Sequence, residues 1–185
     1  MDNDVSAGAT TTIVGRLALG ITLLAFGLGH TDVIDGVTAA DAVSIAHYVG
    51  GIALFVAGLM AFRDRDTANG TAFTALGALW FTWAVSDAGS ANAAGLFFLL
   101  FALVALSLTL AGGDQLGQGT YGLLFVSLVL MAIAAFADNG GLGKVGGWFA
   151  VAAGAVAWYA ATAALAHWPT VLPGRAAGRG VTATG

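Results

Sequence analysis

Uncharged, mostly apolar runs alternate with short groups of charged residues along the whole chain. Arg63 to Asp66 places four charged side chains in succession, and the sequence on either side of this group is almost entirely apolar. Six runs of roughly 20 to 30 residues lie between such groups, and only the first contains an internal charge, Arg16. An α-helix needs about 20 apolar residues to cross the hydrocarbon core of a bilayer. The pattern therefore predicts six membrane spans.

The spans are expected to be helices, because lipid offers no hydrogen-bond partner for an open backbone and the alternation typical of a β-barrel is missing. The chain is thus predicted to be an all-α integral membrane protein, a multi-pass bundle of six transmembrane helices in the cell membrane. The segment before the first span carries Asp2 and Asp4 and no basic residue, so we interpret the first run as a retained helix and not as a signal peptide. The expected spans are residues 13–30, 42–62, 71–86, 92–111, 119–137 and 145–167.

Composition supports this interpretation. Hydrophobic residues make up 58% of the 185 residues and charged residues 9%, whereas a soluble domain carries about 25% charged residues. The acidic loops and the net charge of −4 argue against nucleic acid as a partner. Cysteine is absent, which excludes disulfides and thiolate metal sites.

The basic residues predict the orientation, since arginine and lysine are enriched in cytoplasmic loops. With the N-terminus inside, five arginines lie inside and only Lys144 lies outside. The group from Arg63 to Asp66 then forms the cytoplasmic turn between the second and third spans. Residues 1–12 and 169–185 are expected to be cytoplasmic segments on either side of a transmembrane domain over residues 13–168.

Small residues recur at helical spacing on two spans. Ala53, Ala57 and Ala61 follow one face of the second span, and Gly146, Ala150 and Gly154 follow one face of the sixth. Such stripes let helix backbones approach closely in lipid. They predict tight helix packing, although a general bias toward alanine and glycine would produce the same pattern.

Little catalytic chemistry is available at membrane depth. Ionisable residues are missing from the middle of spans two to six, and no nucleophile lies near a base. Neither enzymatic activity nor a bound cofactor is therefore expected. His30, Asp32 and His47 form too weak a pattern to predict a metal site. The polar side chains at depth that are candidates for lining a pore are Thr22, Thr74, Ser127 and Tyr159. A simpler interpretation is that each hydroxyl bonds to its own helix backbone.

Arg16 lies in the first turns of the first span and allows two interpretations. It is either an anchor whose long side chain reaches back to the membrane interface, or a fixed cation that draws anions to the inner mouth of a pore. The residues alone leave both open, and they reach no further than a helical channel or transporter.

The stretch GGIALFVAGLMAFRDRDTANGTAFTALGALWFTW, residues 50–83, resembles the acetate uptake transporter family. Two other segments resemble the end of that family's sequences, GGWFAVAAGAVAWYAA at 146–161 and TVLPGR at 170–175. The resemblance implies a homo-hexamer in which each protomer encloses its own pore for a small monocarboxylate, as a channel or with a proton. The family's signature before the first span falls on TTTIVGR, residues 10–16, where only Gly15 agrees.

The resemblance also implies a hydrophobic constriction in the pore. Its positions fall on Leu19, Leu76 and Leu128, which also lie at similar places in a faint three-fold repeat of helix pairs. In the same way, Ala157 corresponds to a position that influences substrate size, and Trp148 to the tryptophan that begins the last span. The resemblance makes both residues further candidates for lining the pore. A channel for small neutral solutes such as urea, amides or ammonia, and a membrane protein that transports nothing, are the alternative functions.

Overall fold

The computed structural model describes residues 7–86 and 89–168, and this part of the chain is entirely helical. The long helices are α1 (Ala7–Thr31), α3 (Leu54–Arg63), α4 (Thr67–Val85), α5 (Ala91–Leu110), α6 (Gln115–Phe136) and α7 (Gly140–Leu165). Three short segments precede α3 without a break, the 3-10 helix η1 (Ala39–Ala42), α2 (Val43–Ile45) and the π-helix η2 (Ala46–Ala53). A helical segment therefore occupies each position where a span was expected.

Five segments in the described residues are long and apolar enough to cross a membrane: Thr10–Thr31, Ala39–Arg63, Ala91–Leu110, Gln115–Phe136 and Gly140–Leu165. The protein is thus a multi-pass membrane protein. Helix α4 is not among these five, because its asparagine, threonines and tryptophans lower its mean hydropathy. The predicted tail, residues 169–185, and the first half of the predicted N-terminal segment lie outside the described residues.

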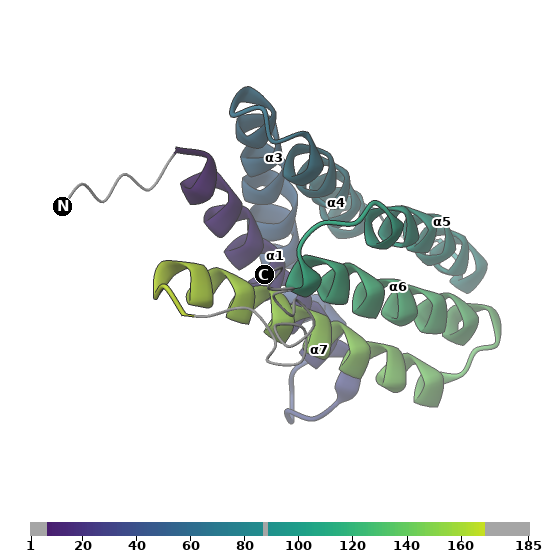
Figure 1. Cartoon of the computed structure of the whole chain (residues 1–185). Helices are drawn as coiled ribbons and strands as arrows, with labels where there is room; N and C mark the ends of the chain where they lie inside the picture. Colours follow the sequence, from purple (N-terminus) through teal and green to yellow (C-terminus); the bar gives the residue numbers. More distant parts are fainter. Residues whose placement is uncertain (1–6, 87–88, 169–185) are drawn as a thin grey trace, which may run out of the picture.

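Helix α1 is the centre of the bundle. It packs along α7 on one side and against η2 and α3 on the other, while α4 packs on α3 and α6 packs between α5 and α7 (Figure 1). Leucine, phenylalanine, tryptophan and alanine side chains from these helices form one continuous core. Many leucine, valine and phenylalanine side chains on the outside of the bundle are exposed, as expected for surfaces that face lipid.

The π-helix interrupts the second predicted span, which the hydrophobic pattern had represented as one regular helix. It contains Gly50 and Gly51, both buried. A Cβ atom on Gly50 would lie 2.5 Å from the methyl carbon of Thr22 and 3.0 Å from Cβ of Trp80. The missing side chain therefore lets the widened turn contact α1 and α4 at the same time. π-turns of this kind often occur near functional sites in membrane and soluble helices.

The charged group that follows α3 builds a compact connection to α4. Arg65 adopts a left-handed backbone with φ of 64°, and the amides of Arg65 and Asp66 donate to the carbonyls of Phe62 and Ala61. This is the hydrogen-bond pattern of a Schellman motif, which ends a helix. The carboxylate of Asp66 then accepts a hydrogen bond from the amide of Asn69 and caps α4. The charges of this turn thus end one helix and begin the next.

The same turn holds the start of α1. The hydroxyl of Thr11 donates to the carboxylate of Asp64 at 2.8 Å, and the hydroxyl of Thr12 donates to Asp66 at 3.4 Å. These residues lie within the segment 10–16, where the family signature was expected. Its threonines bind the first helix to the α3–α4 turn.

Candidate functional site

The three leucines of the expected constriction belong to the core. Leu19 of α1, Leu76 of α4 and Leu128 of α6 are fully buried and are part of the same continuous cluster of apolar side chains. All three therefore have apolar side chains around them, as a hydrophobic constriction requires. Their role as a constriction stays a prediction.

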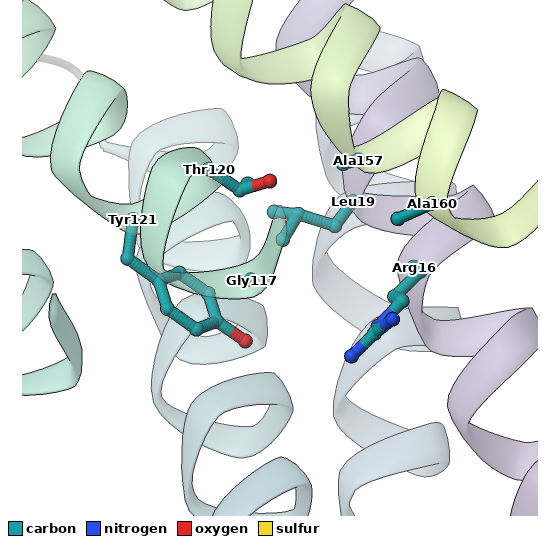
Figure 2. A pocket seen from close by; sticks show the side chains of 7 residues that line it. All are labelled: Arg16, Leu19, Gly117, Thr120, Tyr121, Ala157 and Ala160. Atoms are coloured by element: carbon teal, nitrogen blue, oxygen red, sulfur yellow. The ribbon is translucent and has the colours of Figure 1, made fainter. Parts of the chain in front are cut away.

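A small enclosed cavity lies directly beside Leu19, between α1, α6 and α7 (Figure 2). Its volume of about 10 Å³ corresponds to roughly one water-sized sphere. Leu76 and Leu128 do not line this cavity. The residues around it are Arg16, Leu19, Gly117, Thr120, Tyr121, Ala157 and Ala160.

The cavity brings together predicted residues that are far apart in the sequence. Arg16 and Leu19 come from the first predicted span and Ala157 from the last, and Ala157 is buried. Figure 2 shows the Arg16 side chain on one side of the cavity and the ring of Tyr121 on the other, with Leu19 above and between them in this view. A cation, a phenol and an apolar wall therefore surround a space for one small molecule.

Two larger hollows open beside this cavity. One, of about 640 Å³, lies between the beginning of α6 and the end of α7, and Arg16 lines both it and the small cavity. The other, of about 580 Å³, lies between the beginnings of α4 and α6, and it shares Gly117 and Tyr121 with the small cavity. Asp114 borders both hollows. The small cavity thus adjoins both larger hollows through shared lining residues.

Arg16 and Asp114 form an ion pair at this junction. Nη2 of Arg16 lies 2.5 Å from Oδ1 of Asp114, although 98 residues separate them in the sequence. The Arg16 side chain is 21% exposed and the Asp114 side chain 50% exposed. The other carboxylate oxygen, Oδ2, accepts a hydrogen bond from the amide of Gly117 and caps α6. Arg16 therefore has a defined counter-ion instead of reaching freely into solvent.

The predicted polar residues at depth have three different environments. The hydroxyl of Thr22 donates to the carbonyl of Ala18 on its own helix. The hydroxyl of Thr74 is buried without a hydrogen-bond partner, against Gly58 of the neighbouring helix α3. The hydroxyl of Ser127 donates to the carbonyl of Gly146 at 2.8 Å and joins α6 to α7. None of the three lines one of the hollows described above.

Ser127→Ala is expected to loosen the contact between α6 and α7. The substitution removes the hydrogen bond that Ser127 adds to the carbonyl of Gly146, and a polar contact between membrane helices contributes about 0.6 kcal/mol. Thermal unfolding in detergent should show a small decrease in stability. Thr22→Ala, which removes only a bond within one helix, is the control and should unfold closer to the parent.

Trp148 and Tyr159 lie on the surface of the protomer, with 49% and 39% of their areas exposed. The role in lining the pore that was predicted for them stays a prediction. Trp80, by contrast, is buried in a group of aromatic rings with Phe26 and Trp83, and its indole N–H has no hydrogen-bond partner.

Several residues of the site escaped the sequence analysis: Gly117, Thr120, Tyr121 and Ala160 of the small cavity, and Asp114 of the two hollows. Asp114 carries a sequence signal as a helix cap, because it comes directly before a long apolar run. Nothing in the sequence indicates that it meets Arg16. The hydroxyl of Thr120 donates to the carbonyl of Leu116, as expected of any threonine in an apolar helix.

The weak metal-site pattern does not come together in space. Within residues 7–86 and 89–168, no group of three or more acidic or histidine side chains could hold a metal ion. His30 stacks on Phe26 and its Nδ1 lies 2.7 Å from the carbonyl of that residue. His47 packs on Tyr48 and Phe81.

A family profile matches most of the chain. The sequence pattern of the GPR1/FUN34/yaaH family covers residues 5–171. The protein belongs to this family. The resemblance to acetate uptake transporters that the second, third and sixth spans indicated is therefore confirmed.

Curated relatives come from bacteria and yeasts. The chain is 29% identical to the succinate-acetate/proton symporter SatP of Escherichia coli, over 80% of this chain and 84% of that protein. It is 25% identical to the glyoxylate pathway regulator of Yarrowia lipolytica, over 83% of this chain and 63% of that protein. It is 27% identical to the ammonia transport outward protein 2 of Saccharomyces cerevisiae, over 71% of this chain and 53% of that protein. The chain thus spans only about half to two thirds of these two yeast relatives.

A solved structure has the same fold. The structure of the bacterial acetate channel SatP superposes with a TM-score of 0.78, covering 85% of this chain and 92% of that one at 24% identity. At this identity the likeness concerns the arrangement of the helices.

Proposed function

We propose that this protein carries acetate or a similarly small monocarboxylate across the membrane, as a channel or together with a proton. The observation that carries the proposal is the water-sized cavity beside Leu19, with the cation of Arg16 between it and a wide hollow. A cation at the opening favours a carboxylate, and an apolar narrow end favours a small molecule. The names of the relatives, which refer to acetate and succinate, support the same substrate class.

We further propose that α4 crosses the membrane as a sixth span and that both termini are cytoplasmic. The 19 residues of α4, Thr67–Val85, form one unbroken helix that packs along α3, which supports a sixth span. The ion pair between Lys144 and Asp32, at 3.0 Å, joins the start of α7 to the end of α1. Arg16 lies near the other end of α1, and Arg63 and Arg65 belong to the turn that holds Thr11 and Thr12. These three arginines and Lys144 therefore lie at opposite ends of the bundle, which supports the predicted orientation.

The partners of this function are the substrate, the lipid bilayer and further copies of the chain in a homo-hexamer. No enzymatic activity, cofactor, metal ion or nucleic acid is part of the proposal. In this function acetate and similar acids are released from the protein in the same chemical form in which they were bound.

Conduction of a small neutral solute is the second candidate. A cavity of about 10 Å³ matches one molecule of water or ammonia more closely than a molecule with several heavy atoms. A yeast relative is named for outward ammonia transport. This function needs no cation at the opening, so Arg16 would not contribute to it.

Uptake into proteoliposomes distinguishes these functions. Labelled acetate and labelled urea are offered at pH 7 and pH 5, with protein-free liposomes as the control for acetic acid that crosses the lipid itself. We expect acetate flux above the control that increases at pH 5, because more of the acid is then protonated. A pH-independent flux of urea without acetate flux would favour the neutral-solute channel. No flux of either solute would contradict carboxylate transport and a urea channel, and entry of ammonia, followed by the internal pH of the liposomes, then tests the remaining neutral solute.

A further inference from the structure

We propose that Arg16 binds the substrate's carboxylate at the opening of the pathway and that Asp114 is a built-in competitor for this site. In the structure the carboxylate of Asp114 is bound to the guanidinium of Arg16, and a small carboxylate must displace it from the guanidinium to enter the pathway. The inference rests on the proposed function and names the binding residue and its regulation. It concerns this chain in particular, because Arg16 falls within the segment 10–16 that departs from the family signature.

The position of Arg16 gives it control over entry from the larger hollow. The 640 Å³ hollow and the small cavity share two lining residues, Arg16 and Ala160. Only Arg16 offers a polar contact, because the side chain of Ala160 is a methyl group. A solute that moves from one to the other therefore passes the guanidinium. The wide hollow leaves room for a carboxylate with several carbon atoms in front of Arg16.

The contact that Arg16 makes with Asp114 shows which ligand chemistry the site accepts. Nη2 donates to Oδ1, as a guanidinium does to any carboxylate. Acetate carries the same functional group as the aspartate side chain. Because Asp114 is half exposed and opens onto both hollows, an acid in solution can approach the guanidinium from the side of the larger hollow.

Asp114 can release Arg16 without losing its own position. Its Oδ2 accepts the amide of Gly117 at 3.0 Å, and this cap of α6 does not involve the arginine. Displacement by a substrate therefore costs one partly exposed ion pair and leaves the helix intact. Partly exposed pairs of this kind are weak, so a ligand at millimolar concentration is able to compete.

Other titratable groups surround the pair. The phenol of Tyr121 faces Arg16 across the small cavity, and His167 lines the larger hollow. Asp64 and Asp66 hold Thr11 and Thr12 one turn earlier on α1. Of these groups, Asp114 is the one that contacts the guanidinium. Removing its charge is therefore the most specific way to alter the site.

The test compares Asp114→Asn, Arg16→Gln and the double variant. Asparagine caps a helix as well as aspartate does, so Asp114→Asn keeps the start of α6 and removes only the competing charge. Acetate binding to the detergent-solubilised protein is measured by calorimetry at neutral pH, with acetamide as the neutral probe of the same shape. KM for acetate uptake is measured in proteoliposomes.

We expect the two single variants to act in opposite directions. Asp114→Asn should bind acetate about threefold more tightly, because the competitor is gone. Arg16→Gln should bind it about tenfold more weakly, because a hydrogen bond to a charged group is lost. The double variant should resemble Arg16→Gln, and acetamide binding should be the same in all.

If the ion pair only joins α1 to α6, both single variants lose the same contact, and acetate affinity shifts in the same direction or stays constant in both. That outcome overturns the inference, as does acetate binding too weak to detect in the parent and in Asp114→Asn alike. The proposed function fails separately, when acetate flux is absent while the opposite shifts in binding remain. In that case Arg16 is a carboxylate site of a protein that does not transport acetate.

Discussion

Gly154→Leu is expected to prevent the protomer from folding stably. Gly154 lies where α7 crosses α1, and a Cβ atom on it would lie 2.7 Å from the backbone nitrogen of Leu24 and 2.9 Å from the carbonyl oxygen of Gly20. Backbone atoms cannot rotate away as a side chain does. Overpacking of a core by added methyl groups costs about 1–3 kcal/mol, and leucine at a contact between two backbones should reach the upper end of this range.

The contact is part of a longer zipper between α1 and α7. Gly20 faces Gly154, and Gly27 faces Gly147, where an added Cβ on Gly27 would lie 2.7 Å from the carbonyl oxygen of its partner. The two pairs lie two helical turns apart on each helix, so the glycines form one stripe along α1 and one along α7. A bulky residue at one pair therefore separates the helices over the whole crossing.

Gly143→Ala is the matched control on the same helix. An added Cβ there meets Cβ of Ala134 at 3.8 Å, which is ordinary contact. Alanine should then stabilise α7 by about 0.5–1 kcal/mol relative to glycine. Thermal unfolding followed by tryptophan fluorescence in detergent should show Gly154→Leu well below the parent and Gly143→Ala at or above it. Equal melting temperatures for the two variants would contradict a tight α1–α7 crossing.

The zipper also changes the interpretation of the small-residue stripe on the last span. The stripe Gly146, Ala150 and Gly154 predicted close packing, and all three residues are buried in the described structure. They pack inside the protomer, with Gly154 against α1 and Gly146 against α6. The sequence could not indicate the partner, because helices in an apolar chain present similar hydropathy on every face.

The helices were predictable in position and less so in extent. Charged groups marked the six segments, but α4 begins at Thr67 and α7 at Gly140, both earlier than the apolar runs suggested. The cause is capping: Asp66 and Asn139 each accept a hydrogen bond from the amide three residues later. Cap residues start a helix whether or not the next turn is apolar. The π-helix η2 had no signal at all beyond a pair of glycines.

The candidate site was predictable only in part. Leu19 and Ala157 were identified through it, and Arg16 through its charge in an apolar run. Asp114 and Tyr121 join them through the packing of α6 between α5 and α7. Contacts across 98 residues depend on the helix arrangement, which hydropathy leaves undetermined.

The second large effect is expected at the predicted constriction. Leu128→Ala should increase acetate flux and admit larger acids such as lactate or succinate. Leu128 is fully buried on α6, and the substitution removes methyl groups from the core that it shares with Leu19 and Leu76. If the three leucines narrow the pathway, the space gained lies in the path of the substrate.

An apolar constriction also explains why flux should rise in acid. A bare carboxylate loses its hydration there without a compensating partner, and this costs far more than the transfer of the neutral acid. Carboxyl groups of this type titrate near pH 4, so the neutral fraction grows as pH decreases toward that value. Leu128→Ala makes room for water beside the substrate and should weaken the dependence of flux on pH.

Leu54→Ala is the control for this variant. Leu54 is fully buried in the same core but lies on α3, which contributes no residue to the predicted constriction. Both substitutions create a cavity of similar size and should each cost about 2–5 kcal/mol of stability.

Flux is therefore normalised to folded protein and measured for acetate, lactate and succinate at two pH values. Both variants lose stability, but only Leu128→Ala should widen the pathway. A change in the range of transported acids in Leu128→Ala alone therefore supports the constriction. Identical profiles in both variants and the parent would place the narrowest point at other residues, and the cavity beside Leu19 and Arg16 is then the next position to widen, by Leu19→Ala.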